Sequence, residues 1–384
     1  MKILIISKNI GRTAPGIVIE KLVNGLSKFH NIDLLTSDYD PSFTLSTIKN
    51  VYEIKEKPIH PRIFKFIVSL FGFYPFDWWW ARKGLELVQT KESGKYDLIF
   101  SILSLHHYTP LIAGVYIKKK LSAKFAVHTL DAIPAPIAWP ENKFYFQRVK
   151  NMMWKYLPEC DLISSTNEEM LKYQLSTFLP KKGLLTEIIY NPTHGEMESY
   201  PYCPTNKNVF IFTGGLYGLR KSKYILPAFK EVLLKYPNST LEFFGSYISK
   251  KDLDVFTFEE QKKVIIHPFT RDLNEYYKQS IALIDIDADL PNDVFISSKI
   301  VNYLTINRII ISETSVNSPS RRIFKGIPSI FQCNHDINEL ATAMKKAIEL
   351  KNNIDFRDRE KTLLLFSINS AVEKLNHKFR LLEP

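Results

Sequence analysis

Residues 208–246 limit the possible folds more than any other part of the chain. The segment begins with a short apolar run rich in β-branched and aromatic residues, 209–213, which is typical of a strand buried in a parallel sheet. A glycine turn, an apolar pattern with helical spacing and a second apolar run at 241–245 follow. The order strand, turn, helix and strand predicts a βαβ unit and therefore an α/β fold.

The turn after the first of these strands has the composition of an anion site. Gly214 and Gly215 allow a tight turn and a close approach of a ligand to the backbone, and Arg220 and Lys221 stand just before the helix. Free amide groups at a helix start and fixed positive charge both favour a phosphate, and this arrangement suits a diphosphate better than a carboxylate. The alternative is a tight βα turn with a solvated Arg-Lys pair, because neither a Walker loop nor a G-x-G-x-x-G fingerprint is present.

The length of the chain indicates the number of domains, and its net charge indicates the kind of partner. A chain of 384 residues exceeds what one core usually serves, so we expect two domains. The composition is that of a globular protein, and the net charge of +11 favours an anionic partner such as a nucleotide, an anionic lipid or a nucleic acid. Nucleic acid is the weakest of the three, because the cations are spread along the chain and no DNA- or RNA-binding motif appears.

The cysteines and the first residues predict a cytoplasmic protein. Cys160, Cys203 and Cys333 lie far apart in no metal or redox spacing, which argues against a zinc site or a disulfide framework. Met1 leads directly into an apolar strand at 2–6 without a small-residue cleavage site, so no signal peptide is expected.

A second candidate phosphate or ribose site follows another strand of the same half, 281–286. A loop with aspartates precedes a hydroxyl, a cation and a helix, and since both turns follow strands of one sheet, they can face one ligand. A strand at 264–267 leads into the aromatic end of a further loop. The donor-binding residues predicted from these segments are Gly214, Gly215, His267, Phe269, Asp293, Ser298, Lys299 and Asn302.

The first half also begins with a βαβ unit, whose loop joins the strand at 2–6 to a helix. Gly11, Arg12 and Gly16 lie in this loop, at the carboxyl end of the strand, where open parallel sheets place ligands. We therefore predict an acceptor-side loop here. The alternative, that Gly16 merely starts the helix, is equally compatible with the sequence.

Residues 62–84 form the most biased stretch, with many phenylalanines and three consecutive tryptophans between basic residues. Its apolar run is too short to span a bilayer, but tryptophan beside Arg and Lys is typical of a membrane interface. The alternative is a core helix with aromatic packing. The predicted membrane-contact residues are Phe71, Phe73, Trp78, Trp79 and Trp80.

Histidines and an aspartate follow two strands of the first half. His106 and His107 end one strand, and His128 and Asp131 lie at the end of the next. The sequence does not decide which histidine lines the ligand cleft, and a structural role is the commoner outcome for any one of them. We predict catalytic roles for His128 and Asp131, together with Arg220 and Lys221.

The whole pattern resembles the GT-B glycosyltransferases, specifically retaining family 4. FTGGLYGLRK resembles the donor-diphosphate turn, DVFISSKIVNYLTINRIIIS the segment of the Glu-x7-Glu motif, and DLISSTNEEM the last strand and helix of the first domain. The chain departs from the family where Gly215 replaces an Arg or Ser and where the two motif glutamates fall at Val294 and Asn302. In the second case the amide of Asn302 can still hold a ribose.

The resemblance implies two Rossmann-like domains that face each other across a cleft. The expected divisions are an acceptor-binding domain at 1–195, a linker at 196–207, a nucleotide-sugar domain at 208–365 and a terminal helix at 366–384 that can cross back to the first domain. It further implies metal-independent transfer, with retention of configuration and no cofactor, from a nucleotide-diphosphate sugar to a lipid-linked or surface-polysaccharide acceptor. Such an enzyme would work in the cytoplasm, at the inner face of the membrane.

Two other functions remain open from the sequence. The first is a nucleotide-sugar 2-epimerase of the same fold, for which the aromatic stretch would have no purpose. The second is a partner subunit that binds sugar nucleotides without turnover, which the two missing motif glutamates allow.

Overall fold

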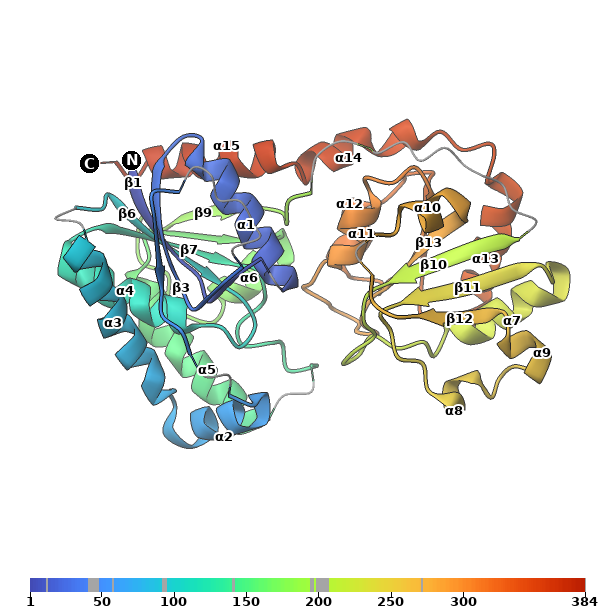
Figure 1. The fold of residues 1–384 in the computed structure, drawn as a ribbon, viewed down its shortest axis with the longest axis horizontal. Helices are drawn as coiled ribbons and strands as arrows, with labels where there is room; N and C mark the ends of the chain where they lie inside the picture. The colour runs from blue at the N-terminus through green and yellow to red at the C-terminus, as the bar shows by residue number, and fades with distance from the viewer. Residues whose placement is uncertain are drawn as a thin grey trace. The chain divides into compact units, whose positions relative to one another are not determined.

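A computed structural model describes residues 1–11, 13–40, 48–56, 59–91, 95–139, 142–193, 197, 207–270 and 272–383. The chain divides into two compact units (Figure 1). The amino-terminal unit contains residues 1–192 and 368–384, and the carboxy-terminal unit contains residues 193–367. Of the predicted linker at 196–207, only its residues 197 and 207 are described.

The amino-terminal unit is built on a seven-stranded, wholly parallel sheet in the order β5-β3-β1-β6-β7-β8-β9. The strands are apolar along nearly their full length, because helices cover both faces of the sheet. Its strands are β1 (Lys2–Ile6), β3 (Asn31–Thr36), β5 (Asn50–Glu53), β6 (Leu98–Leu103), β7 (Lys124–Thr129), β8 (Leu162–Ser165) and β9 (Leu185–Ile188), with β2 (Asn9–Ile10) and β4 (Asp38–Tyr39) as a separate pair.

The two faces of this sheet bury separate apolar cores (Figure 1). Ile3 and Ile5 of β1 face α1 and the terminal helix α15, whereas Leu4 and Ile6 face the core that α3, α4 and α5 complete. This alternation is the period of two expected of a strand. The helices are α1 (Ala14–Ser27), α2 (Pro61–Phe71), α3 (Pro75–Lys91), α4 (Thr109–Leu121), α5 (Lys143–Tyr156), α6 (Glu168–Leu175) and α15 (Ile368–Arg380), with a short 3-10 turn at Leu157–Glu159.

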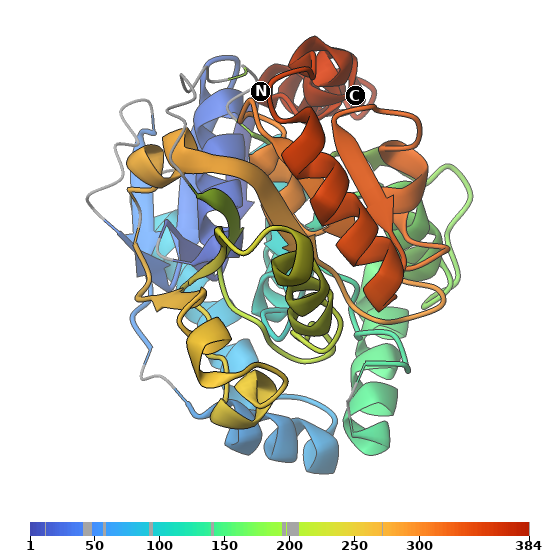
Figure 2. The same ribbon diagram turned by 90° about the vertical axis from the view of Figure 1, so that its right-hand side faces the viewer.

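The carboxy-terminal unit contains a six-stranded parallel sheet in the order β12-β11-β10-β13-β14-β15. One face is covered by α7 and α13, which lie side by side and bury a single core with the sheet (Figure 2). The strands are β10 (Asn208–Thr213), β11 (Ser239–Phe244), β12 (Val264–His267), β13 (Ser280–Ile286), β14 (Ile309–Glu313) and β15 (Ile330–Cys333).

The helices of this unit are α7 (Ile225–Lys235), α8 (Lys250–Leu253), α9 (Phe258–Gln261), α10 (Asn274–Gln279), α11 (Ser298–Tyr303), α12 (Pro319–Ile323), α13 (Ile337–Leu350) and α14 (Glu360–Leu365), with a 3-10 turn at Phe356–Arg359. Both units are therefore Rossmann-like, doubly wound α/β domains, which confirms the predicted fold class. The terminal helix α15 packs against α1 and β9, so the chain returns to the amino-terminal unit after completing the second one.

Candidate functional site

The strand order places a crevice in the carboxy-terminal unit between β10 and β13. Numbered from β10, the order is 3-2-1-4-5-6, and the connections leave in opposite directions from these two neighbouring strands. In open parallel sheets, ligands bind at this switch point, outside the carboxyl ends of the strands. The glycine turn follows β10, and the aspartate-rich loop follows β13.

Gly214 is shaped by its neighbour Lys299. The residue has a φ of +91°, which favours glycine, and its backbone N–H donates to the carbonyl of Phe244 at 2.8 Å. A Cβ at this position would lie 2.9 Å from Cε of Lys299. The turn therefore needs glycine both for its backbone conformation and for the passage of the lysine stem. Gly215 has neither restriction, since a Cβ there would meet only Tyr217 at 3.7 Å.

Lys299 places its ammonium group over two aromatic rings. Its Nζ atom lies 5.3 Å from the ring centroid of Phe212 and 6.0 Å from that of Tyr217. Burial and repulsion from Arg220 lower the pKa of the Lys299 ammonium to about 8. Among the described residues, this ammonium has no ion pair, so it is a partly desolvated positive charge available to an anion.

Arg220 is buried and paired, which the sequence did not indicate. Its guanidinium lies 3.2 Å from the carboxylate of Asp287 and donates to the hydroxyl of Tyr217 at 2.8 Å. Burial disfavours the charged guanidinium, but attraction to Asp287 raises its pKa above the usual value. Tyr217 touches both cations, because the guanidinium carbon lies 5.4 Å from its ring centroid. Arg220 and Lys299 therefore lie around one tyrosine.

Buried carboxylates surround these two cations. Asp285, Asp287 and Asp293 each have one carboxylate oxygen that is buried without a hydrogen-bond partner among the described residues. Burial and repulsion from Asp287 raise the pKa of Asp293 to about 7 and that of Asp285 to about 6. Asp293 accepts from the backbone N–H groups of Val294 and Phe295, which fixes its orientation. The sequence reasoning included Asp293 and missed the other two.

The predicted residues His267 and Phe269 form an aromatic surface at the ends of β11 and β12. His267 stacks on Phe244 with centroids 4.2 Å apart, and its Nε2 lies 2.9 Å from a carboxylate oxygen of Glu242. Phe269 is 73% exposed and lies against Gly245, whose φ is +75°. A flat, partly exposed aromatic patch of this kind can stack with a planar ring.

Three other predicted residues of this unit are exposed. Lys221, Ser298 and Asn302 make no side-chain hydrogen bond to another described residue. Their roles stay predictions. The cap of α11 comes from Ser297, which accepts from the Lys299 backbone N–H and donates to Asp285 at 2.6 Å. This contact links the buried aspartate to the helix that carries the lysine.

The amino-terminal unit has its own switch point, between β1 and β6. Gly11 has a φ of +96°, and a Cβ on Gly16 would lie 2.8 Å from the Gly11 backbone nitrogen. The two glycines allow α1 to begin close against the loop, and Thr13 caps the helix by accepting from the Gly16 N–H. Arg12 lies outside the described residues.

His128 and Asp131 have structural partners. His128 is 1% exposed, its Nδ1 lies 2.9 Å from the hydroxyl of Ser164, and burial lowers its pKa to about 4. The side chain of His128 is enclosed in the unit, because β7 is a central strand with both faces covered, and its catalytic role stays a prediction. Asp131 accepts from the backbone N–H of Leu105 at 2.9 Å and so fixes the loop after β6.

That loop carries the other two histidines. His106 has a φ of +64°, and its Nδ1 lies 2.9 Å from the hydroxyl of Tyr145. Burial lowers the pKa values of both His106 and His107 to about 4. They are less enclosed than His128 and therefore better placed for a ligand at this edge of the sheet.

A polar network beside β1 was missed by sequence reasoning. Lys8 forms an ion pair with Glu56, and its ammonium lies 5.6 Å from the ring centroid of Trp80. Asp77 accepts from the hydroxyl of Thr109 at 2.6 Å, and burial raises its pKa to about 6. The signal was present in the aromatic stretch, where Asp77 is the only acid, but its partners are distant in sequence.

The three tryptophans do not form one surface. Trp80 is fully buried and donates to the hydroxyl of Ser37 at 2.8 Å, and Trp78 is half-buried against Tyr116. The prediction of membrane contact is wrong for Trp80, because its ring is fully buried, and for Trp78 it stays a prediction. Consecutive helical residues point about 100° apart, so the three rings cannot share one face. Trp79 is 48% exposed, and Phe71 and Phe73 are also exposed.

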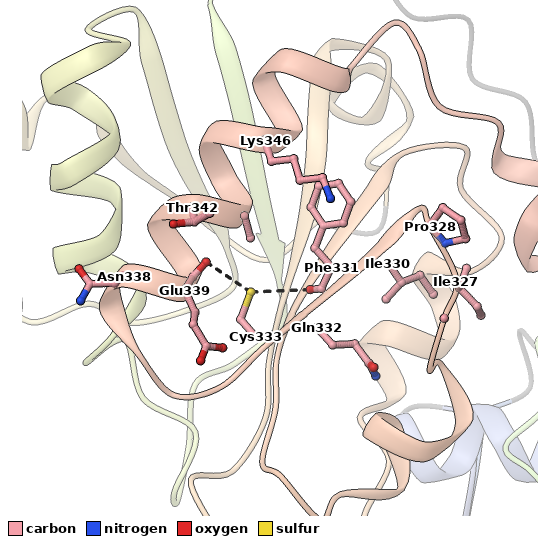
Figure 3. A pocket seen from close by; sticks show the side chains of 12 residues that line it. Ile327, Pro328, Ile330, Phe331, Gln332, Cys333, Asn338, Glu339, Thr342 and Lys346 are labelled. Atoms are coloured by element: carbon pink, nitrogen blue, oxygen red, sulfur yellow. Dashed lines mark hydrogen bonds between the residues drawn. The ribbon is translucent and has the colours of Figure 1, made fainter.

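A hollow of about 650 Å³ lies elsewhere in the carboxy-terminal unit, between the edge strand β15 and helix α13 (Figure 3). Cys333 lines it and contacts backbone carbonyls of Phe331 and Glu339 through its sulfur. The lining contains none of the predicted donor residues. Across the described residues, no group of three or more His, Cys, Asp or Glu side chains could hold a metal ion. Nor is any described helix both long and apolar enough to cross a membrane.

Neither a protein-family model nor a curated protein matches the sequence. Solved structures do match over nearly the whole chain. Anabaena HepE (Alr3699), in complex with UDP and glucose, has a TM-score of 0.66 at 13% identity, with 99% of both chains covered. The lipopolysaccharide outer core galactosyltransferase WaaB, in its apo form, has a TM-score of 0.65 at 13% identity, also with 99% of both chains covered. The chain has a GT-B fold.

A third structural neighbour carries a different name. A Listeria monocytogenes protein named as a UDP-N-acetylglucosamine 2-epimerase has a TM-score of 0.59 at 11% identity, over 99% of this chain and 95% of that one. Identities this low establish the fold alone, so the reaction must be argued from the residues at the switch point.

Proposed function

We propose that the protein is a glycosyltransferase that moves a sugar from a nucleotide-diphosphate donor to an acceptor hydroxyl. The observation that carries this proposal is the position of Lys299, an ammonium without an ion pair among the described residues, at the switch point of the carboxy-terminal unit. Gly214 leaves room for the stem of Lys299 there, and Arg220 adds a second fixed charge. The UDP complexes of HepE support UDP as the nucleotide.

The positive charges at the switch point can stabilise the diphosphate as it leaves the sugar. When the bond between the sugar carbon and the diphosphate oxygen breaks, its electron pair goes to the diphosphate, which gains negative charge. Lys299 and Arg220 are held in place before the reaction, so they stabilise this charge with little reorganisation. The exposed ammonium of Lys221 lies one residue further along the turn and is proposed to reach the same group. We assign the leaving-group stabilisation to these three side chains, without a metal.

The remaining donor groups have proposed partners in the same unit. Asp293 has a free carboxylate oxygen and a pKa of about 7, so it can accept or donate a hydrogen bond to a sugar hydroxyl. His267 and Phe269 offer a ring surface for the base. Ser298 and Asn302, both exposed on α11, are proposed ribose or phosphate contacts.

The amino-terminal unit is the proposed acceptor domain, and the loops after β1 and β6 are its proposed contacts. Asp131 would act as a positioning residue, because it holds the loop with His106 and His107. We further propose retention of configuration, with attack from the face that the diphosphate leaves. A lipid-linked or surface-polysaccharide acceptor at the cytoplasmic face of a membrane is supported by the name of WaaB.

The similarity to the protein named as an epimerase supports epimerisation as a second candidate function. An epimerase would return a sugar changed at one carbon and would need no acceptor. The buried aspartates leave this reaction chemically open, since an acid with a raised pKa can serve as a general base. Transfer is favoured because the partly desolvated ammonium of Lys299 at the switch point is placed for the diphosphate leaving group rather than for the sugar carbon that an epimerase must deprotonate.

The test combines binding with product analysis. A panel of UDP-, GDP-, CMP- and dTDP-sugars is screened by thermal unfolding, where saturation at a hundred times the Kd adds about 2.7 kcal/mol. The stabilising donor is then incubated with the protein and a membrane lipid extract. Nucleotide release with labelled lipid product, and retained anomeric configuration by NMR, is the expected result. Recovery of a 2-epimer would identify an epimerase, and stabilisation without any turnover would identify a binding subunit.

A further inference from the structure

One face of helix α2 exposes large apolar side chains to solvent. Ile63, Phe66 and Leu70 recur at i, i+3 and i+7, which places them on one side of the helix, and they are 53%, 63% and 54% exposed. Phe71, the last residue of α2, and Phe73, two residues further along the chain, are also exposed. We call these five residues the α2 face. A contiguous exposed apolar row of this kind marks an interaction surface.

The rest of α2 is well packed, so its exposure is not a sign of a poorly formed helix. His60 caps its first turn, Pro61 occupies the first helical position, and Gly72 ends it with a φ of +76°. Phe64 packs against the rings of Tyr74 and Tyr108, and Val68 is fully buried. The sequence has therefore built a stable helix and left one apolar side of it uncovered.

A second side of α2 packs against α5. The Arg148 guanidinium donates to the carbonyl of Ser69 at 3.4 Å, and the Lys65 ammonium lies 5.6 Å from the ring centroid of Tyr145. Helix α5 itself exposes Phe144 and Trp154. The two helices lie next to each other at one end of the amino-terminal unit (Figure 1). Both helices therefore expose aromatic and basic side chains.

The charged side chains of α2 and α5 are all positive. Neither α2 nor α5 contains an aspartate or glutamate. The one acid at the start of α3, Asp77, is 1% exposed and points inward. The cations of the two helices are Arg62, Lys65, Lys143, Arg148, Lys150 and Lys155.

We propose that the α2 face, together with the cations of α5, docks the protein on an anionic lipid bilayer. Helix α2 would lie in the plane of the interface, with Phe66 and Leu70 in the acyl boundary and the Lys and Arg side chains at the head groups. Phe71, Phe73 and Trp79 lie on the exposed side of this region and add aromatic rings at head-group depth. This docking is independent of the proposed reaction, since it requires no donor.

A second copy of the chain is a less suitable occupant. A two-fold interface places the same patch on both sides, so the cations of α2 and α5 would face their own copies. Like charges that face each other across an interface are destabilising. An anionic bilayer instead satisfies the apolar row and the cations at once.

The test is co-flotation of the full chain with vesicles. Vesicles of phosphatidylglycerol mixed with phosphatidylcholine are compared with vesicles of phosphatidylcholine alone. We expect binding to the anionic vesicles that weakens with added salt, because exposed charges are screened. The double variant Phe66→Glu/Leu70→Glu should lose at least about tenfold in bound fraction, since it places charge on the apolar row. The variant Arg62→Gln/Lys150→Gln should bind severalfold less, and only to the anionic vesicles.

The matched control is Leu179→Glu, which changes another leucine of the same unit that is 71% exposed. It should float like the unaltered protein. UDP-dependent thermal stabilisation of each variant reports on folding and on the donor site, so loss of vesicle binding is separable from failure of the proposed reaction. Flotation of Phe66→Glu/Leu70→Glu at the unaltered level would overturn the proposal. So would a dimer by analytical ultracentrifugation that this variant converts to a monomer, without vesicle binding by either form.

Discussion

The two parallel sheets have corresponding switch points with opposite electrostatic character. Beside β1 in the amino-terminal unit, the Lys8 ammonium is paired with Glu56. Beside β10 in the carboxy-terminal unit, the Lys299 ammonium lies over aromatic rings and has no ion pair among the described residues. The same topology therefore provides two switch points, and of the two lysines compared, the one beside β10 is unpaired in the described part of the chain. The strand order sets the position of each switch point. Whether the lysine there is paired with a carboxylate decides whether its charge is available to an anion.

The two lysines also differ in their effect on the free energy of unfolding. In the Lys8 pair each charge has its partner, so removing one partner is costly. Burial lowers the pKa of Lys299 to about 8, so its charged form costs stability, and we propose that an anionic ligand compensates for this cost. Three experiments test whether the two switch points differ in this way.

The largest effect is expected at the buried pair of Arg220 and Asp287. Arg220→Met leaves a carboxylate that is 1% exposed without its counter-charge, which costs about 3–5 kcal/mol of stability. The double variant Arg220→Met/Asp287→Asn should recover most of this loss, because no buried charge remains. Urea unfolding of the three proteins measures both values. Equal instability of the single and double variants would show that Arg220 contributes packing rather than charge compensation.

A smaller effect should separate the two lysines. Lys299→Met should weaken UDP binding by about 10- to 100-fold, since a hydrogen bond to a charged group is worth about 1.5–3 kcal/mol, and should leave the unfolding midpoint unchanged or higher. Lys8→Met is the matched variant of the other switch point. It should leave the Kd for UDP unchanged and lower stability, because Glu56 loses its partner.

Titration calorimetry and thermal unfolding give these two readouts. An unaltered Kd for Lys299→Met, or a raised one for Lys8→Met, would reverse the assignment of the anion site to the carboxy-terminal unit.

The smallest effect is expected in the pH dependence of UDP binding. The charged form of Lys299 binds the diphosphate, and a bound anion favours that form. Affinity should therefore fall as the pH rises through the pKa of about 8 in the free protein, by at most about tenfold per pH unit. Lys299→Arg should bind with little change over the same range, because arginine stays charged. A flat profile for the unaltered protein would mean that Lys299 does not contact the diphosphate.

Sequence reasoning succeeded where the signal was local. The strand, turn and helix at 208–235 and the helix that carries Ser298 and Lys299 were predicted from patterns within a few residues. The structure has these elements, with Ser298 and Lys299 as the first two residues of α11. It failed where the answer depended on residues far apart in the chain. Asp287 lies 67 positions from Arg220, and Glu56 lies 48 positions from Lys8. No local pattern connects such pairs.

Residues 62–84 show both a success and a failure of sequence reasoning within one segment. Their composition predicted exposed aromatic residues, and Phe71 and Phe73 are exposed. The direction of each ring, however, was set by what the helices pack against. Trp80 turns inward to Ser37, whereas Phe66 and Leu70, which were not singled out, turn outward.

The sequence by itself determined the fold class, because the apolar periodicity of strands and helices is a property of neighbouring residues. It also determined that glycines and cations follow two strands of the carboxy-terminal half. Only the tertiary structure decided which of these cations is neutralised and which aromatic rings are exposed. The physical reason is that pairing and burial depend on the three-dimensional environment of a side chain, and strand order brings together residues that the sequence separates.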